Sequence, residues 1–172
     1  MSNAGFGDIR PIGHDDWPQV YSLIERQFMR KDEARLIETL QQEKLIVYAL
    51  LIERNGDFNG AIFFSRIHIR HNDQMHDALA LGPIVVDHPW QGRGLGGTLI
   101  EHGHKDLAAA GEKIVFVLGE AEYYSRFGYS VEVAKNYQCP YTGPFFLCLK
   151  CSDDVPASGQ LIYPKAFADL SS

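Results

Sequence analysis

The sequence predicts a mixed α/β domain, and three observations lead to this fold class. Apolar residues at three- and four-residue spacing, namely Trp17, Val20, Tyr21, Ile24 and Phe28, predict an amphipathic helix. Later segments rich in Leu, Ile, Val and Tyr predict strands, because branched and aromatic side chains favour extended structure. A glycine-rich run separates a predicted strand from a predicted helix. Since the chain has 172 residues, no repeat and no long linker, we expect a single domain over residues 1–172.

Three of the four predicted helices carry a signal at one of their ends. Asp15 and Asp16 precede Trp17, which predicts a capping carboxylate at the start of the first helix. Gly111 is a stop signal for a helix that starts near Leu95. The predicted helices cover residues 17–28, 32–42, 95–111 and 121–127, the last one ended by Gly128.

The predicted strands are separated by turn residues. Leu45–Glu53 and Gly60–Ile69 read as a hairpin, because Asn55-Gly56-Asp57 between them has turn chemistry. Ala78–Val86 reads as a strand that Gly82-Pro83 interrupts, and proline cannot donate to a sheet, so we expect a bulge or local splaying there. The other predicted strands are Lys113–Leu118, Val131–Val133 and Phe145–Leu149.

Composition excludes some functional classes. A net charge of -6 with only 16 Lys and Arg argues against a nucleic-acid surface and favours a cationic or neutral small substrate. No window is apolar enough to predict a membrane span, and the start Met1–Gly5 lacks a basic and then apolar region. We therefore expect a cytosolic protein with no membrane partner. We expect the first few residues to be in part a remnant of cloning, or disordered.

The three cysteines predict free thiols, because an odd count without a secretory signal fits a reducing compartment. Cys148 and Cys151 have the spacing of a redox pair, but they end a predicted strand, where side chains three apart face opposite sides. We interpret them as packed thiols.

Metal binding is not expected. The histidine pairs His68 with His71 and His102 with His104 lack an evident third ligand in the sequence. Two residues that are two apart on a helix also do not share a face.

The run Gly92-Arg93-Gly94-Leu95-Gly96-Gly97 predicts a phosphate site. At a helix start the backbone N–H groups lack acceptors and the helix dipole favours an anion, while glycines let a phosphate come close. An ordinary tight turn is the alternative, but four glycines within six residues disfavour it. A Walker loop does not fit, because no Gly-Lys-Ser/Thr ends the run.

A dinucleotide site for NAD remains an alternative. Gly92, Gly94 and Gly97 satisfy the GxGxxG fingerprint, and Glu120 ends the next predicted strand. However, Asp87–Gln91 separate the first glycine from the preceding strand, whereas the fingerprint follows its strand almost directly. About fifty residues remain after Glu120, which is too few for a doubly wound sheet.

The segment Leu81–Tyr129 resembles the GCN5-related N-acetyltransferases (GNAT superfamily), whose acetyl-CoA loop has the form Gln/Arg-x-x-Gly-x-Gly/Ala. Here that pattern is Gln91, Gly94 and Gly96. The resemblance is strongest to the subgroup of YhbS-like predicted N-acetyltransferases. The segments that carry it are Leu81-Gly82-Pro83, Trp90–Gly94, Val117–Gly119, Tyr123–Tyr129 and, more loosely, Leu161–Phe167. These motifs are specific for the superfamily and its cofactor, and they do not name the acceptor.

The resemblance implies the GNAT fold: a central mixed, mostly antiparallel sheet of about six or seven strands, flanked by helices and splayed at the acetyl-CoA site. It also implies that backbone groups of Ile84–Val86 pair with pantetheine and that the Val86 N–H polarises the thioester carbonyl. Arg93 either adds a positive charge near the pyrophosphate or only faces solvent. The residues expected to bind acetyl-CoA are Ile84, Val85, Val86, Gln91, Gly92, Arg93, Gly94, Leu95, Gly96, Gly97 and Thr98.

For the chemistry, the resemblance implies that a tyrosine donates a proton to the departing thiolate. Tyr124 stands four residues before Gly128 and is the preferred residue, with Tyr123 as the adjacent alternative. Glu120, Glu122 or a chain of waters could take the proton from the amine, and the sequence does not decide among them.

The expected function is therefore transfer of an acetyl group from acetyl-CoA to an amine by direct attack in a ternary complex. The acceptor is expected to be a small-molecule amine or an amine of a peptide or protein, and a homodimer is left open. The competing hypothesis is a non-catalytic acyl-CoA-binding module that acts as a sensor or scaffold.

Overall fold

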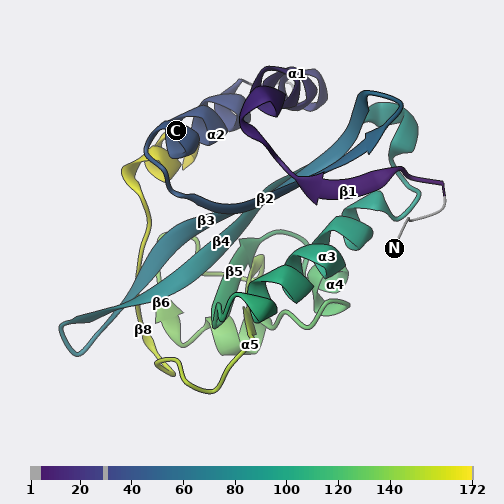
Figure 1. Ribbon diagram of the computed structural model, residues 1–172. Coiled ribbons are helices and arrows are strands. Elements are labelled where there is room, and N and C mark those ends of the chain that lie inside the picture. The colour runs from purple at the N-terminus through teal and green to yellow at the C-terminus, as the bar shows by residue number, and fades with distance from the viewer. Residues whose placement is uncertain (1–4, 29–30, 172) are drawn as a thin grey trace. The chain divides into compact units, whose positions relative to one another are not determined.

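The computed structural model describes residues 5–28 and 31–171 of the chain (Figure 1). Contacts between residues group into two units. The first unit comprises Met1–Phe64, Pro83–His104 and Lys165–Ser172, and the second comprises Ser65–Gly82 and Lys105–Pro164. The single domain over residues 1–172 stays a prediction. The expectation about the first few residues falls mainly on residues 1–4, outside the described part.

Helices and strands appear close to where the sequence predicts them. The helices are α1 Trp17–Gln27, α2 Asp32–Gln42, α3 Leu95–Ala109, α4 Ala121–Ser125 and α5 Val131–Ala134, with 3-10 turns η1 His14–Asp16, η2 His88–Trp90 and η3 Lys165–Ser171. The strands are β1 Asp8–Pro11, β2 Ile46–Arg54, β3 Asp57–His71, β4 Gln74–Val86, β5 Ile114–Leu118, β6 Tyr137–Gln138, β7 Phe146–Lys150 and β8 Gly159–Ile162. Within the described ranges, no helix combines the length and apolar character needed to cross a membrane.

The strands pair in the order β1-β2-β3-β4-β5-β7, with β8 bonded to β3 and β6 to β8. The β1–β2, β3–β8 and β5–β7 pairs are antiparallel, and the β4–β5 and β6–β8 pairs are parallel. Two-residue connections join β2 to β3 and β3 to β4, and such short connections require antiparallel neighbours. The predicted mixed, mostly antiparallel sheet is thus confirmed. Eight strands occur among the described residues, because β1 and the short β6 and β8 add to those that the sequence pattern predicts.

The two hairpin turns follow from residues that tolerate positive φ. Asn55 and Gly56 have φ of 54° and 84°, and Asn72 and Asp73 have φ of 51° and 62°. Consecutive positive φ angles match the twist of the strands that such a turn joins. The first turn confirms the hairpin predicted at Asn55-Gly56-Asp57.

The irregularity predicted at Gly82-Pro83 has a clear position in the sheet. The parallel register joins Leu79, Ala80 and Leu81 of β4 to Val115, Phe116 and Val117 of β5. The described register ends there, and Gly82 follows with φ of 135°, which favours glycine. Gly82 therefore marks the residue at which β4 leaves its parallel partner.

The core of the first unit lies between β3 and the two N-terminal helices (Figure 1). Ala61 and Phe63 of β3 share a buried cluster with Leu23 and Ile24 of α1 and with Ile37 of α2. Successive residues of a strand point to opposite faces, and Gly60 and Phe64 face the other way, toward Leu95 and Gly103 of α3. The 3-10 turn η3 packs beside α2 and adds Ala166 and Phe167 to the cluster.

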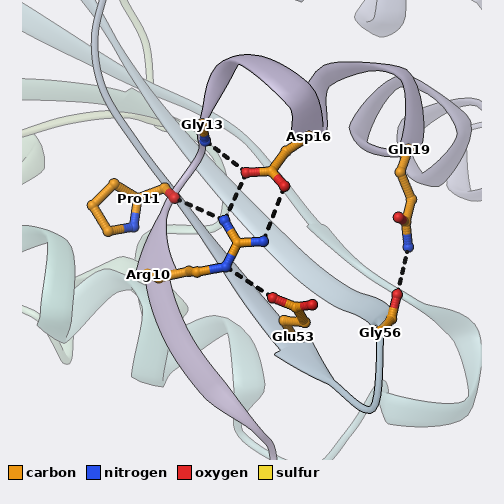
Figure 2. Close-up of polar contacts among 7 residues, drawn as sticks. All are labelled: Arg10, Pro11, Gly13, Asp16, Gln19, Glu53 and Gly56. Atoms are coloured by element: carbon orange, nitrogen blue, oxygen red, sulfur yellow. Dashed lines mark hydrogen bonds and ion pairs between the residues drawn. The ribbon is translucent and has the colours of Figure 1, made fainter.

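Arg10 of β1 links this strand to β2 and to the start of α1 (Figure 2). Its guanidinium donates to both carboxylate oxygens of Asp16, at 2.6 and 2.9 Å, and to Glu53 Oε2 at 2.8 Å. The hydrogen bond and charge of Arg10 lower the pKa of Asp16 below its usual value. Asp16 Oδ2 also accepts from the Gly13 N–H at 2.6 Å, and no hydrogen bond from its side chain caps α1. The predicted capping carboxylate is therefore wrong in detail: Asp16 binds Arg10 and the turn before the helix.

The strand predicted at Val131–Val133 is also wrong, since these residues begin the one-turn helix α5. Ser130 caps this helix, because its Oγ accepts from the Val133 N–H at 3.1 Å. The Ser130 backbone pairs with Cys148 of β7 through two hydrogen bonds of 2.8 and 3.1 Å. Ser130 therefore makes a single β-bridge just before the helix begins. The β-branched residues Val131 and Val133 that follow contain no local signal for this turn.

In the second unit, Cys148 lies inside the core at 1% exposure, whereas Cys151 follows the end of β7 and is exposed. Both thiols are free. The prediction of packed thiols is confirmed for Cys148 and is wrong for Cys151, which lies after the strand in an exposed position. Burial raises the pKa of the Cys148 thiol from 9.0 to about 12.

We therefore expect Cys148 to make stability fall at alkaline pH. A thiol whose pKa is higher in the folded than in the unfolded state stabilises the fold below pH 9.0, and this contribution is lost as pH rises toward about 12. In Cys148→Ala the free energy of unfolding should fall less steeply between about pH 9 and pH 11. Urea unfolding at several pH values measures both slopes. If the free energies of unfolding of the wild type and the variant change with pH at the same slope, the assignment is wrong. A constant difference between them, from the lost packing of the thiol, does not affect this comparison.

Candidate functional site

The glycine-rich loop leads directly into α3 in the first unit. Gly92 and Gly94 have φ of 75° and 85°, a conformation that favours glycine, and both are exposed. Thr98 makes the first bonds of the helix: its N–H and its Oγ1 both donate to the Gly94 carbonyl, each at 3.1 Å. The N–H groups of residues 95–97 lie in the first helical turn, before any intrahelical acceptor is available. This end of α3 is therefore suited to bind an anion.

Gln91 holds the loop to the rest of the first unit. Its Nε2 donates to the Val86 carbonyl at 3.0 Å and to Gln27 Oε1 at 3.1 Å. Gln27, in the last turn of α1, in turn donates to Asp87 Oδ1 at 2.9 Å. The Gln91 side chain thus fixes the end of β4 and the start of the loop relative to α1.

The turn between β4 and the loop is closed by backbone bonds. Asp87 donates its N–H to the Asn59 carbonyl of β3 at 2.8 Å, and its own carbonyl accepts from Trp90 at 2.8 Å. The Arg26 guanidinium lies 3.6 Å from Asp87 Oδ1. These contacts give the five residues Asp87–Gln91 a fixed course.

Two arginines gather around the indole of Trp90 next to the loop. The Arg93 guanidinium carbon lies 5.2 Å from the centre of the Trp90 ring, and that of Arg54 lies 5.5 Å from it. Both arginines are exposed, and each is held by a cation–π contact. Arg54 ends β2, far from the loop in sequence, so no local pattern identifies it as a candidate.

Gly60 of β3 is a second residue that sequence reasoning missed. A Cβ atom there would lie 2.7 Å from Leu95 Cδ2 and 3.1 Å from the Val85 carbonyl oxygen. Leu95 is the first residue of α3 and is buried. Only glycine at this position lets the start of α3 and the end of β4 approach β3 this closely.

Tyr124 lies in α4 of the second unit, with its ring against the backbone of Gly119. A Cβ atom on Gly119 would lie 2.4 Å from Tyr124 Cε2, so the ring covers the glycine directly. The ring also meets those of Tyr123 and Tyr129 edge-on, at centroid distances of 5.0 and 5.8 Å. Burial, and to a lesser degree Tyr123, raises the pKa of Tyr124 to about 12. The phenol therefore stays protonated at neutral pH and can act as a donor.

The neighbours of Tyr124 differ from it in their surroundings. The Arg126 guanidinium carbon lies 4.7 Å from the centre of the Tyr123 ring, and burial raises the pKa of Tyr123 while Arg126 opposes that rise. Glu120 precedes α4 as its N-cap residue, and both Glu120 and Glu122 are exposed. Of the two tyrosines, Tyr124 is the one that packs on the strand end.

The histidines His68 and His104 differ in their surroundings. His68 Nε2 is 3.4 Å from Asp77 Oδ1, and burial lowers the pKa of His104. In the part of the chain that the structure describes, no three His, Cys, Asp or Glu side chains gather as metal ligands would.

Residues 8–132 match the acetyltransferase (GNAT) domain family. This chain belongs to that family. The match contains both the glycine-rich loop and Tyr124, so the resemblance predicted from the motifs is confirmed.

Curated relatives agree with this membership. The chain is 28% identical over 129 residues to the uncharacterized N-acetyltransferase YhbS of Escherichia coli K12, covering 74% of this chain and 76% of that protein. It is 34% identical over 132 residues to the uncharacterized N-acetyltransferase YjhQ of the same strain, covering 75% of this chain and 73% of that protein.

Two solved structures share the fold over nearly the whole chain. The structure of Escherichia coli YhbS in complex with CoA matches with a TM-score of 0.86 and 25% identity, covering 98% of this chain and 95% of that one. A GNAT acetyltransferase of Brucella melitensis in complex with acetyl-CoA matches with a TM-score of 0.78 and 28% identity, covering 93% and 97%. As a family member, the chain is an N-acetyltransferase with a GNAT fold.

Proposed function

We propose that this protein transfers the acetyl group of acetyl-CoA to an amine by direct attack in a ternary complex. The observation that carries the proposal is the exposed start of α3, where positive-φ glycines precede helix N–H groups suited to an anion. Relatives of the same family have been crystallised with CoA and with acetyl-CoA, which supports acetyl-CoA as the donor. The donor is a substrate that is consumed in each turnover.

We assign the pyrophosphate to the loop and the first turn of α3. The residues are Gly92, Arg93, Gly94, Leu95, Gly96, Gly97 and Thr98, with Gln91 holding the loop in place. Arg93 supplies positive charge for the phosphates. We propose Arg54 as a further phosphate-binding residue, because its guanidinium contacts the same Trp90 indole as that of Arg93.

We assign the pantetheine arm to the backbone of Ile84, Val85 and Val86, the residues of β4 after Gly82-Pro83. The described parallel register with β5 ends before them. The Val86 carbonyl already accepts from Gln91, so the role proposed for Val86 rests on its N–H, which would donate to the thioester oxygen as negative charge develops there.

In the reaction, the neutral amine nitrogen forms a bond to the thioester carbon and the carbon–sulfur bond breaks. The amine loses one proton, to water or to one of the exposed carboxylates Glu120 and Glu122. Tyr124 donates to the departing sulfur, so that CoA leaves as a thiol. A cytosolic location, the choice between a small and a protein-bound amine, and a homodimer stay predictions.

The test of the proposed function is thiol release. With acetyl-CoA and a panel of primary amines, we expect free CoA to appear at a rate that depends on the amine, above hydrolysis without amine. Mass spectrometry of the acceptor should show one added acetyl group per thiol released. Tight acetyl-CoA binding without amine-dependent release on the whole panel would instead indicate an acyl-CoA-binding sensor or scaffold.

A further inference from the structure

Two positive charges lie beside the glycine-rich loop, around the indole of Trp90. Arg93 belongs to the loop itself, whereas Arg54 ends β2, and the guanidinium groups of both contact the Trp90 ring. Phe6 meets the same ring edge-on, at a centroid distance of 6.5 Å. All four residues belong to the first unit, which also contains the loop and the start of α3. The Trp90 ring therefore holds two cations next to the proposed pyrophosphate site.

Arg54 is fixed in position without being neutralised. Its Nη1 donates to the Gly5 carbonyl at 2.8 Å, which uses one of the five N–H donors of the guanidinium. Glu53, the preceding residue, accepts from Arg10 at 2.8 Å instead. Within the described ranges, no ion pair joins Arg54 to a carboxylate. Because the Arg54 side chain is exposed, an anionic ligand can approach its remaining donors.

The pyrophosphate already has binding groups in the proposed function, namely the N–H groups of residues 95–97 and the charge of Arg93. CoA carries one further phosphate, a monoester on the 3′-oxygen of the ribose whose 5′-oxygen carries the pyrophosphate. Such a monoester has a charge of about -1.5 to -2 at neutral pH, and a guanidinium can bind it with two parallel hydrogen bonds. Arg54, separated from Arg93 by one indole ring, is therefore placed to meet the second phosphate group of the same nucleotide.

We propose that Arg54 binds the 3′-phosphate of CoA, so that the protein selects CoA and its thioesters over the 3′-dephospho forms. This inference rests on the proposed function and names the part of the donor that is recognised. Trp90 is a positioning residue, because its ring holds both guanidinium groups through cation–π contacts. Arg93 stays with the pyrophosphate.

The test compares the binding of CoA and of 3′-dephospho-CoA by calorimetry, because these ligands differ only in the 3′-phosphate. The wild type should bind CoA about tenfold more tightly, as one charge-assisted contact at an exposed site provides. Arg54→Gln should lose about tenfold in affinity for CoA and little for dephospho-CoA. High salt should reduce the preference of the wild type, since exposed charges are screened.

Arg70→Gln is the matched control. Arg70 is an exposed arginine of β3 that belongs to the second unit, so this variant removes the same charge from the chain. It should keep the wild-type ratio of the two affinities. The ratio also controls for folding, because general damage to the site in Arg54→Gln would weaken the binding of both ligands.

Three results would overturn the inference. The first is equal affinity of the wild type for CoA and dephospho-CoA, and the second is an unchanged ratio in Arg54→Gln. The third is an equal loss for both ligands in that variant, because Arg54 would then contact the pyrophosphate or support the loop. The proposed function stands in each case if thiol release still depends on the amine. A ratio that changes as expected without amine-dependent thiol release would contradict the proposed function alone.

Discussion

Gly96→Val should fold normally and lose about tenfold to hundredfold in affinity for acetyl-CoA. Gly96 lies in the first turn of α3, where valine is intrinsically more favourable than glycine, so the backbone is not strained. A branched side chain there would obstruct the phosphates and displace one charge-assisted hydrogen bond, worth about 1.5–3 kcal/mol. Calorimetry with acetyl-CoA measures the loss, and NADH should bind far more weakly than acetyl-CoA to the wild type.

Gly94→Val adds a second effect, since Gly94 has φ of 85° and a β-branched residue is strained there. It should therefore lose stability as well as affinity. Gly111→Val is the matched control: Gly111 has φ of 82°, and as at Gly94 nothing lies within 4 Å of the added Cβ. That variant should be destabilised to a similar degree and keep wild-type affinity. Unchanged affinity in folded Gly96→Val would remove the loop from the binding site.

Tyr124→Phe should lower kcat roughly a hundredfold, the usual size of a general-acid contribution, with little change in acetyl-CoA affinity. Phenylalanine keeps the ring that covers Gly119 and meets Tyr129, so folding should be unaffected. Single-turnover acetyl transfer is the measurement, because slow product release can hide a change in the chemical step.

Tyr123→Phe is the control for this experiment, since it removes a hydroxyl from the adjacent ring. The raised pKa of Tyr124, about 12, adds a test by pH. The donor form is the protonated phenol, so wild-type transfer should not fall between about pH 8 and pH 10 through loss of this proton. If Tyr124→Phe keeps the wild-type transfer rate and Tyr123→Phe loses it, Tyr123 is the proton donor. If neither variant loses rate, solvent protonates the departing thiolate.

The elements with strong local signals were predictable. A few neighbouring residues are enough to predict each of these elements. The spacing of apolar residues predicts α1 and α2, and Asn-Gly at residues 55–56 predicts the turn. The prediction of a strand at Val131–Val133 was wrong because the structure there depends on a distant residue. Ser130, which caps the helix, is held by a bridge to Cys148, eighteen residues away. A window of β-branched residues contains no information about that partner.

By itself the sequence determined the superfamily, the glycine-rich helix start and the irregularity after Leu81, because glycine and proline restrict or free the backbone at their own positions. Only the tertiary structure decided which distant residues support the site. Gly60 is needed because Leu95 and Val85 approach it, and Arg54 joins Arg93 because both contact Trp90. Each of these depends on contacts between segments 25 or more residues apart, which packing and strand register fix and local sequence does not.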